Sequence, residues 1–194
     1  MARRSAADAE QTRRAIVRAA RNAFAKHGFA GASTAEIARA AKVTEGAFFH
    51  HFRSKKAVFA DVLHELESEL TAHAIEAGGN DAPAEALLRA CRHSLEYAQR
   101  PDYQRIVMLD GPTVLGDTDW RRVDSGFGLA ALRAGIRRMA PKDALADREI
   151  RMLAVAILGV LNETSFALAR GERGVSIEGG MAMVERLLDA ALRR

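Results

Sequence analysis

Aromatic, imidazole and cationic side chains crowd together in the stretch FFHHFRSKK, which begins at Phe48. Phe48 and Phe52 are four residues apart, so on a helix they share one face, which we expect to point into a core. Phe49, His50 and His51 then point elsewhere and can lie along a sugar-phosphate backbone. The stretch predicts the edge of a nucleic-acid interface; a small helical core with a solvated polar surface is the alternative.

The charge of the chain is divided unevenly along its 194 residues. Residues 1–60 contain 12 Lys or Arg against 4 Asp or Glu, a net +8, and residues 61–194 contain 17 against 21, a net −4. A basic segment joined to a mildly acidic remainder indicates that only the basic segment meets a polyanion. A solvated basic face without a partner explains the charge equally well.

The chain is expected to be all-α, because no segment alternates with period two and only four prolines occur. A first helix is predicted over 8–27, ended by Gly28 in a left-handed conformation. Ser33 and Glu36 match the capping-box pattern, which opens a short second helix. Further helices are predicted over 45–51, 55–77, 82–100, 103–109, 118–140, 146–171 and 176–193, about nine in all, and 110–117 is expected to be a loop.

The second and third predicted helices form a helix-turn-helix, joined by a turn around Lys42 and a buried Val43. In this motif the second helix enters the DNA major groove with its N-terminal end nearest the bases. Behind it, the ammonium of Lys55 and the free N–H groups of the next helix can hold a phosphate. The residues predicted to bind DNA are Ser33, Thr34, Thr44, Glu45, Gly46, Ala47, Phe49, His50, His51 and Lys55.

Residues 16–62 resemble the N-terminal domain of TetR-family transcriptional regulators. The matching residues are Ala20, Phe24, Gly28, Phe29, Ser33, Glu36, Ile37, Ala38, Ala41, Val43, Thr44, Gly46, Phe48, Phe49, His51, Phe52, Ser54 and Lys55. The resemblance implies a three-helix DNA-binding domain over 8–54 and a larger helical-bundle domain over 55–194 for ligand binding and dimerisation. It also implies double-stranded operator DNA, a second copy of the chain and an unidentified small-molecule effector as partners.

Two residues depart from the pattern of that family. Tyrosine is usual where Phe49 stands, and its hydroxyl commonly contacts a phosphate, so part of the phosphate grip is expected to pass to His50, His51 and Lys55. Glycine is usual where Lys42 stands. A lysine held in a left-handed turn costs roughly 1 kcal/mol, which a fold can tolerate.

The last two predicted helices carry the signs of a dimer interface. The helix over 146–171 is apolar on nearly all sides from Met152 to Leu161, so it is expected to face both its own core and another surface. The last helix repeats apolar residues in a heptad-like seam, at Ile177, Met181, Val184, Leu188 and Ala191. A four-helix bundle shared by two chains follows from this pattern and the resemblance; a single larger monomeric core is the alternative.

The candidate ligand-binding residues are Tyr97, Trp120, Asn162 and Glu163. Asn162 and Glu163 interrupt an apolar run, and a buried carboxylate there needs a partner. They can meet a polar group of a ligand, or bond across the dimer seam or to a neighbouring arginine. Tyr97 and Trp120 can equally belong to the core.

An enzyme is not expected, because the chain has no phosphate-binding glycine loop and no nucleophile with a base at a suitable spacing; no catalytic residue or cofactor is assigned. His64 and His73 are nine residues apart on one predicted helix, so a solvated face is favoured over a metal site. The lone Cys91 is expected to be a small core residue.

A cytoplasmic protein is expected, because the longest apolar run, residues 153–161, is too short to span a bilayer and the first residues lack the apolar core of a signal peptide. The sequence therefore predicts a sequence-specific DNA-binding transcriptional regulator, a ligand-responsive repressor released from its operator by a small molecule. The alternative is a ligand-binding helical protein or a small helical enzyme that does not use its DNA-binding head.

Overall fold

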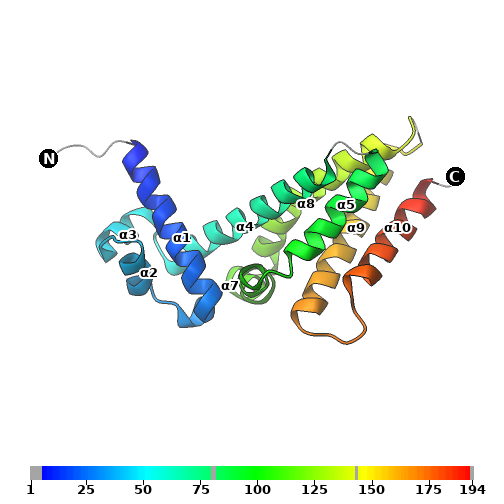
Figure 1. The fold of residues 1–194 in the computed structure, drawn as a ribbon. Helices are drawn as coiled ribbons and strands as arrows, with labels where there is room; N and C mark the ends of the chain where they lie inside the picture. Colours follow the sequence, from blue (N-terminus) through cyan, green and yellow to red (C-terminus); the bar gives the residue numbers. More distant parts are fainter. Residues whose placement is uncertain (1–5, 80–81, 143, 193–194) are drawn as a thin grey trace. The chain divides into compact units, whose positions relative to one another are not determined.

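The computed structural model describes residues 6–79, 82–142 and 144–192. Within these ranges the chain forms ten α-helices and one π-helix and no strand, so the prediction of an all-α protein is confirmed, with ten helices in place of about nine (Figure 1). The helices are α1 Ala6–Gly31, α2 Thr34–Ala40, α3 Glu45–His51, α4 Lys55–Gly78, α5 Pro83–Tyr97, α6 Pro101–Tyr103, the π-helix η1 Gln104–Asp110, α7 Gly111–Leu115, α8 Asp117–Met139, α9 Asp147–Ala169 and α10 Ile177–Leu192.

Two compact units divide the chain. The first contains the residues up to Leu66 together with Pro101–Asp117, and the second contains Glu67–Arg100 and the residues from Thr118 onwards. The predicted functional domains, 8–54 and 55–194, divide the chain at a different place, and as functional ranges they stay a prediction. The units part inside α4, so this helix belongs to both.

The core of the first unit is aromatic. Phe24 and Phe59 are fully buried, and their ring centroids are 5.2 Å apart at a steep interplanar angle. The ring of Phe29 lies 5.2 Å from that of Phe59 and 5.9 Å from that of Phe24. Edge-to-face aromatic contacts of this kind add to the free energy of burial. They hold the C-terminal half of α1 against the first turns of α4.

The predicted end of the first helix is instead a break within α1: Gly28 has the expected positive φ of 68°, but its ψ of 173° is extended and not that of the left-handed helix. One further turn then continues the helix as far as Gly31. The positive φ favours glycine here, and a Cβ atom on Gly28 would also push the guanidinium of Arg105 out of its place. The turn after Gly28 therefore lies directly beneath a side chain that comes from η1.

The segment expected to be a loop, residues 110–117, is helical as far as Leu115, so that prediction is wrong. Its Asp-Gly-Pro sequence is typical of turns, but Pro112 lies in the first turn of α7. A proline is tolerated there because the N–H that it lacks has no partner within the helix. Gly116, with φ 86°, ends the helix.

The second unit packs α5, α8, α9 and α10 around one apolar core, in which Leu95, Ile136, Ile157 and Val184 are fully buried. Cys91 belongs to the same core and is only 1% exposed, so its prediction as a core residue is confirmed. Burial raises the pKa of its thiol to about 12, because the thiolate would be desolvated. A thiol of this kind is inert toward alkylation and oxidation in the folded protein.

Gly28→Ala is predicted to destabilise the first unit more than Gly116→Ala does. Both glycines have a positive φ and an extended ψ, so each alanine carries a backbone cost of about 1–3 kcal/mol. Only at Gly28 does the new methyl group also displace Arg105, since nothing lies within 4 Å of a Cβ at Gly116. Urea unfolding of both variants measures the difference, and equal losses in the free energy of unfolding would contradict the close packing of Arg105 over Gly28.

Candidate nucleic-acid interface

The turn between α2 and α3 has the geometry of a helix-turn-helix. Lys42 adopts the predicted left-handed conformation, with φ 57°. Its N–H donates to the carbonyl of Arg39 at 3.0 Å, and the N–H of Val43 donates to that of Ala38 at 3.0 Å. The strain at Lys42, roughly 1 kcal/mol, is therefore offset by two backbone hydrogen bonds that close α2.

Val43 is half-buried and not buried as the sequence suggested. The turn lies at the surface between two helices of seven residues each, and the interior beneath it is already filled by Ile37 and Phe48, both fully buried. The backbone of Val43, more than its side chain, holds the turn closed.

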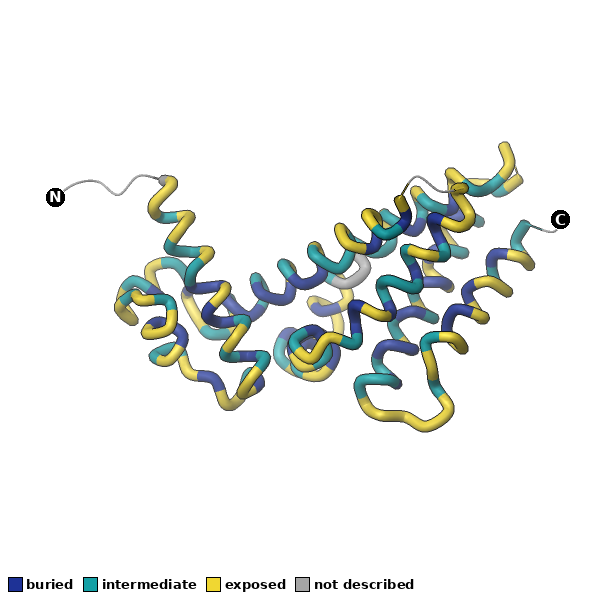
Figure 2. Tube along the Cα trace, in the orientation of Figure 1, coloured by how far each residue is buried: buried dark blue, intermediate teal, exposed yellow. Residues whose placement is uncertain are grey.

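The start of α3 is capped and open to solvent. The hydroxyl oxygen of Thr44 accepts a hydrogen bond from the N–H of Ala47 at 3.1 Å, which fixes the first turn of the helix. Thr44, Glu45 and Gly46 are exposed and Ala47 is half-buried. Figure 2 colours the whole chain by burial, and most of the tube over α2 and α3 is exposed or half-buried. A hydroxyl that accepts one N–H can still donate its own hydrogen, so Thr44 retains a donor for a phosphate.

The aromatic residues of α3 divide between inside and outside as predicted. Phe48 and Phe52 are 0% and 4% exposed, whereas Phe49 is 48% exposed. His50 is exposed and His51 half-buried, and their ring centroids are 5.5 Å apart. One face of this short helix thus anchors it, and the other presents an apolar ring and two imidazoles to the surroundings.

The capping box that opens α2 is formed. The Ser33 hydroxyl oxygen accepts from the N–H of Glu36 at 3.2 Å, and the Glu36 carboxylate accepts from the N–H of Ser33 at 3.2 Å and from its hydroxyl at 3.0 Å. These hydrogen bonds lower the pKa of Glu36 below its usual value, the one from the hydroxyl most of all. The Ser33 hydroxyl is already engaged within the protein, whereas the half-buried Thr34 follows it at the first position of the helix. Their contacts with DNA stay a prediction.

Lys55 has a second set of partners that the sequence did not reveal. Its ammonium nitrogen lies 2.7 Å from the carbonyl oxygen of Phe29 and 2.8 Å from that of Ala32, and 4.5 Å from the centroid of the Phe29 ring. Nothing in the spacing of residues 29 and 55 signals this contact. An ammonium group has three donors, so two are occupied by carbonyls and one can still meet a phosphate.

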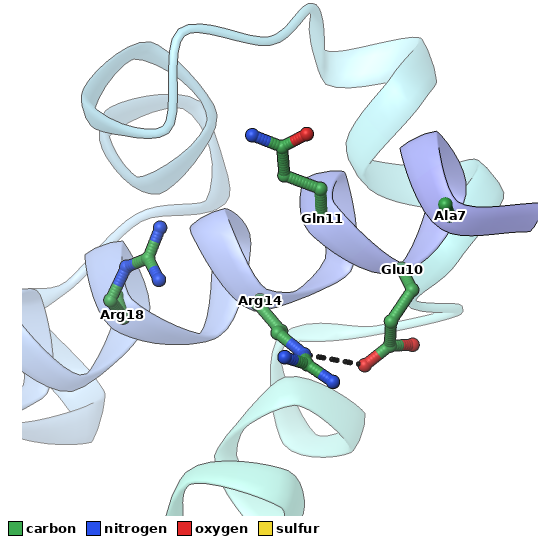
Figure 3. A pocket seen from close by; sticks show the side chains of 5 residues that line it. All are labelled: Ala7, Glu10, Gln11, Arg14 and Arg18. Carbon is green, nitrogen blue, oxygen red and sulfur yellow. Dashed lines mark hydrogen bonds and ion pairs between the residues drawn. The ribbon is translucent and has the colours of Figure 1, made fainter.

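The basic residues of α1 are tied to the protein in different ways. Arg13 forms an ion pair with Asp61 and lies over the ring of Phe52, 5.2 Å from its centroid, which links α1, α4 and the end of α3. Arg14 pairs with Glu10 at 2.9 Å along the same helix. Figure 3 shows a shallow hollow over α1, lined by Ala7, Glu10, Gln11, Arg14 and Arg18. Because one helix supplies every lining residue, the hollow does not define a binding site.

The four candidate ligand-binding residues lie on α5, α8 and α9. Tyr97 is buried and donates its hydroxyl hydrogen to Glu69 at 2.8 Å, and the buried Trp120 lies 5.2 Å from the ring of Phe166. Asn162 is half-buried. Glu163 is exposed, so the expectation of a buried carboxylate is wrong: within the single chain it lies on the outward side of α9. Their role in ligand binding stays a prediction.

In the described part of the chain, no group of three or more His, Cys, Asp or Glu side chains is placed to hold a metal ion. By length and composition α9 resembles a membrane-crossing helix. The core helices of globular proteins have the same length and composition, and the inner side of α9 contributes Ile157 and Leu161 to the core of the second unit.

Two family profiles match the chain. The profile of bacterial regulatory proteins of the tetR family matches residues 16–62, and the profile of the tetracyclin repressor-like C-terminal domain matches residues 84–191. Together they cover the helix-turn-helix and most of the second unit.

Curated proteins and solved structures resemble the chain as well. The HTH-type transcriptional regulator SrpR of Pseudomonas putida is 35% identical over 115 residues, 57% of this chain and 52% of that protein, so the match spans about half of the relative. The HTH-type transcriptional repressor AcnR of Corynebacterium efficiens is 28% identical over 187 residues, 94% of this chain and 93% of that protein. The crystal structure of a TetR-family transcriptional regulator from Pectobacterium atrosepticum is 30% identical, with a TM-score of 0.81, and the alignment covers 98% of this chain and 99% of that one.

Proposed function

Since the chain belongs to the TetR family of transcriptional regulators, we propose that it is a dimeric, cytoplasmic repressor that reads operator DNA with α3 and releases it when a small molecule binds. The observation that carries this proposal is the start of α3, capped by Thr44 and open to solvent at Glu45 and Gly46. A rigid helix end with exposed side chains is what entry into a major groove requires. No catalytic role is proposed.

Base reading is assigned to Glu45 and Ala47, in the first turn of α3. A glutamate carboxylate accepts from the amino group of cytosine, and an alanine methyl group contacts the methyl group of thymine. Gly46 lies between them and has only the Thr44 hydroxyl, 3.9 Å from where a Cβ would be, as a neighbour. It leaves room for a close approach of DNA to the backbone of the helix.

Contact with the sugar-phosphate backbone is assigned to Phe49, His50, His51 and Thr44, together with Lys55. Phe49 stands where the family usually has a tyrosine, and it lacks the tyrosine hydroxyl. The donors to phosphate are therefore the imidazoles of His50 and His51, the hydroxyl of Thr44 and the ammonium of Lys55. Contacts of this kind fix the register of a protein on DNA but carry no sequence information.

Dimerisation is assigned to the outward faces of α9 and α10. On α9 the exposed residues Met152, Val155, Ala156 and Gly159 recur at helical spacing, opposite the core-facing Ile150, Ala154, Ile157 and Leu161. The heptad-like seam predicted on α10 is wrong as a dimer surface, because Met181, Val184 and Leu188 are buried in the chain's own core. The outward face of α10 instead carries Gly179, Ala182, Met183, Arg186 and Ala190, also at helical spacing. Faces rich in small and apolar residues allow helices of two chains to pack closely. Glu163 continues the α9 stripe, which favours a place at the dimer seam over contact with an effector.

The effector is proposed to act through α4, the helix that both compact units share. A ligand held by the second unit can change the direction of this helix and so the separation of the two recognition helices. They must lie about 34 Å apart to enter successive major grooves. A ligand shifts such an equilibrium only by its difference in affinity for the two shapes.

Glu45→Gln, and Ala47→Leu separately, are predicted to change the preferred DNA sequence without abolishing binding. Gln exchanges an acceptor for a group that also donates, and leucine replaces a small methyl contact with a bulky one. Each good base contact contributes about 1–3 kcal/mol of discrimination. Selection from a random DNA pool measures the consensus, with Lys26→Ala, an exposed cation on α1, as the control. An unchanged consensus for both variants would mean that these positions do not read bases.

Val155→Arg is predicted to dissociate the dimer. The side chain is 44% exposed in one chain and would be covered by the partner, so arginine would leave two charges per dimer in an apolar seam. We expect the dimer dissociation constant to rise at least tenfold, about 1.4 kcal/mol. Sedimentation velocity measures it, with Ile75→Arg as the matched control, since Ile75 is 62% exposed on α4. The same shift in both variants, or in neither, would contradict this interface.

Binding of an effector is predicted to weaken operator binding by roughly 5- to 150-fold, the range of typical coupling energies. Thermodynamic reciprocity requires operator DNA to weaken effector binding by the same factor. A compound screen by fluorescence anisotropy finds the effector, and calorimetry with and without operator measures the reciprocal effect. A screen in which no compound alters operator affinity would argue against a ligand-controlled switch while leaving DNA binding intact.

A further inference from the structure

Phe29 connects two charged side chains through its own peptide groups. Its carbonyl oxygen accepts from the ammonium of Lys55 at 2.7 Å, and its N–H donates to the carboxylate of Asp110 at 2.7 Å. Both distances are short, as expected for hydrogen bonds to ionised groups. A single residue at the end of α1 is thereby held from both sides, by the first residue of α4 and by the last residue of η1.

Asp110 is well placed to fix this turn of the chain. Its side chain is 18% exposed and also lies 3.4 Å from the guanidinium of Arg105. That guanidinium covers Gly28, the residue whose positive φ turns the backbone toward Phe29. Asp110 thus accepts from the N–H of Phe29, the residue directly after the break at Gly28, and its partner Arg105 lies over Gly28 itself.

A second contact fastens the same segment to α1. Two nitrogens of the Arg21 guanidinium lie 3.1 and 2.8 Å from one carboxylate oxygen of Asp102. The two side chains are 18% and 19% exposed, so water screens this pair only in part. The segment Pro101–Asp117 therefore contacts α1 through Asp102, near its start, and through Asp110, near its middle, and the chain connects it to the second unit at each end.

We propose that Asp110 is a positioning residue for DNA binding, which fixes the backbone of Phe29 and through it holds the ammonium of Lys55 in place for a phosphate. This inference rests on the proposed function, because it requires Lys55 to contact DNA. Lys55 is the first residue of α4, four residues after the end of α3, and in this proposal its third donor meets a phosphate beside the recognition helix. Asp110 never touches DNA in this account and acts only through the turn.

The direction in which DNA affinity changes when the Asp110 carboxylate is removed distinguishes a positioning role from simple electrostatics. Removal of a negative charge should, by Coulomb attraction alone, strengthen binding to a polyanion. If Asp110 positions Lys55, removal of its carboxylate weakens binding instead. Glu96→Ala supplies the matched control, because it removes one negative charge from an exposed position on α5.

The test is a double-mutant cycle with the full-length protein and a labelled duplex selected by the wild type from a random pool. Fluorescence anisotropy over a salt series gives the affinity and the salt slope of the wild type, Lys55→Ala, Asp110→Ala, Asp110→Asn and the double variant Lys55→Ala with Asp110→Ala. Each single alanine variant is expected to lower affinity about tenfold, the scale of one charge-assisted contact, and to reduce the salt slope by roughly 1 for each half-site.

The double variant is expected to bind no more weakly than Lys55→Ala alone, because both changes remove the same contact. Asp110→Asn keeps a neutral acceptor, so we expect its DNA affinity to lie between that of Asp110→Ala and that of the wild type. Thermal unfolding confirms that each variant is folded. If Asp110→Ala does not fold, Asp110→Asn takes its place in the cycle with Lys55→Ala.

Three results would each overturn the proposal. The first is that Asp110→Ala binds DNA as tightly as Glu96→Ala does, with an unchanged salt slope. The second is that the losses of binding free energy in the two single variants add in the double variant, and the third is that Lys55→Ala binds DNA as tightly as the wild type. Each of these leaves DNA binding by the wild type in place. If the wild type itself selects no sequence and shows no salt-dependent binding, the proposed function fails and not merely the role of Asp110.

Discussion

The carbonyl oxygens of Phe29, in the last turn of α1, and of Ala32, just after that helix, accept from the ammonium of Lys55, and the arrangement of the DNA-binding unit depends on this contact. The last carbonyls of a helix have no partners within it and must find them elsewhere. Here they find a cation from the first turn of α4, which brings the end of α1, the start of α2 and the start of α4 to one point. Phe24, Phe29 and Phe59 then pack around that point, so the charge that satisfies the helix also fixes the aromatic core beside it.

The two helices of the binding motif depend on this scaffold because they are too short to be stable alone. Each has seven residues, well below the length at which an isolated helix forms in water. Their stability comes from the Ser33–Glu36 capping box, the Thr44 cap and the burial of Ile37 and Phe48. The outward residues of α3 contribute little to this packing, so they are free to vary with the DNA sequence that a regulator has to read.

Features set by near neighbours in the chain could be predicted, and features set by distant residues could not. The caps at Ser33 and Thr44 and the inward Phe48 follow from spacing of a few residues, and the left-handed Lys42 follows from the family resemblance, since glycine is usual at that position. The partners of Lys55 and Asp110 lie 26 and 81 residues away, and no local pattern encodes such a pairing. Gly111 and Pro112 predict a turn where residues 111–115 form a helix, because both residue types are typical of turns. The composition of α9 does not show which of its sides faces outward, so it does not reveal that Glu163 is exposed.

Salt dependence of binding to two duplexes tests the central claim, that the basic first unit reads specific DNA, most directly. One duplex is selected by the protein from a random pool and the other has the same composition in scrambled order. The account predicts that the logarithm of the affinity falls linearly with the logarithm of salt concentration for both, with a selected duplex bound roughly 10³-fold or more tightly at physiological salt. Equal affinity for the two duplexes, or binding that does not respond to salt, would contradict it.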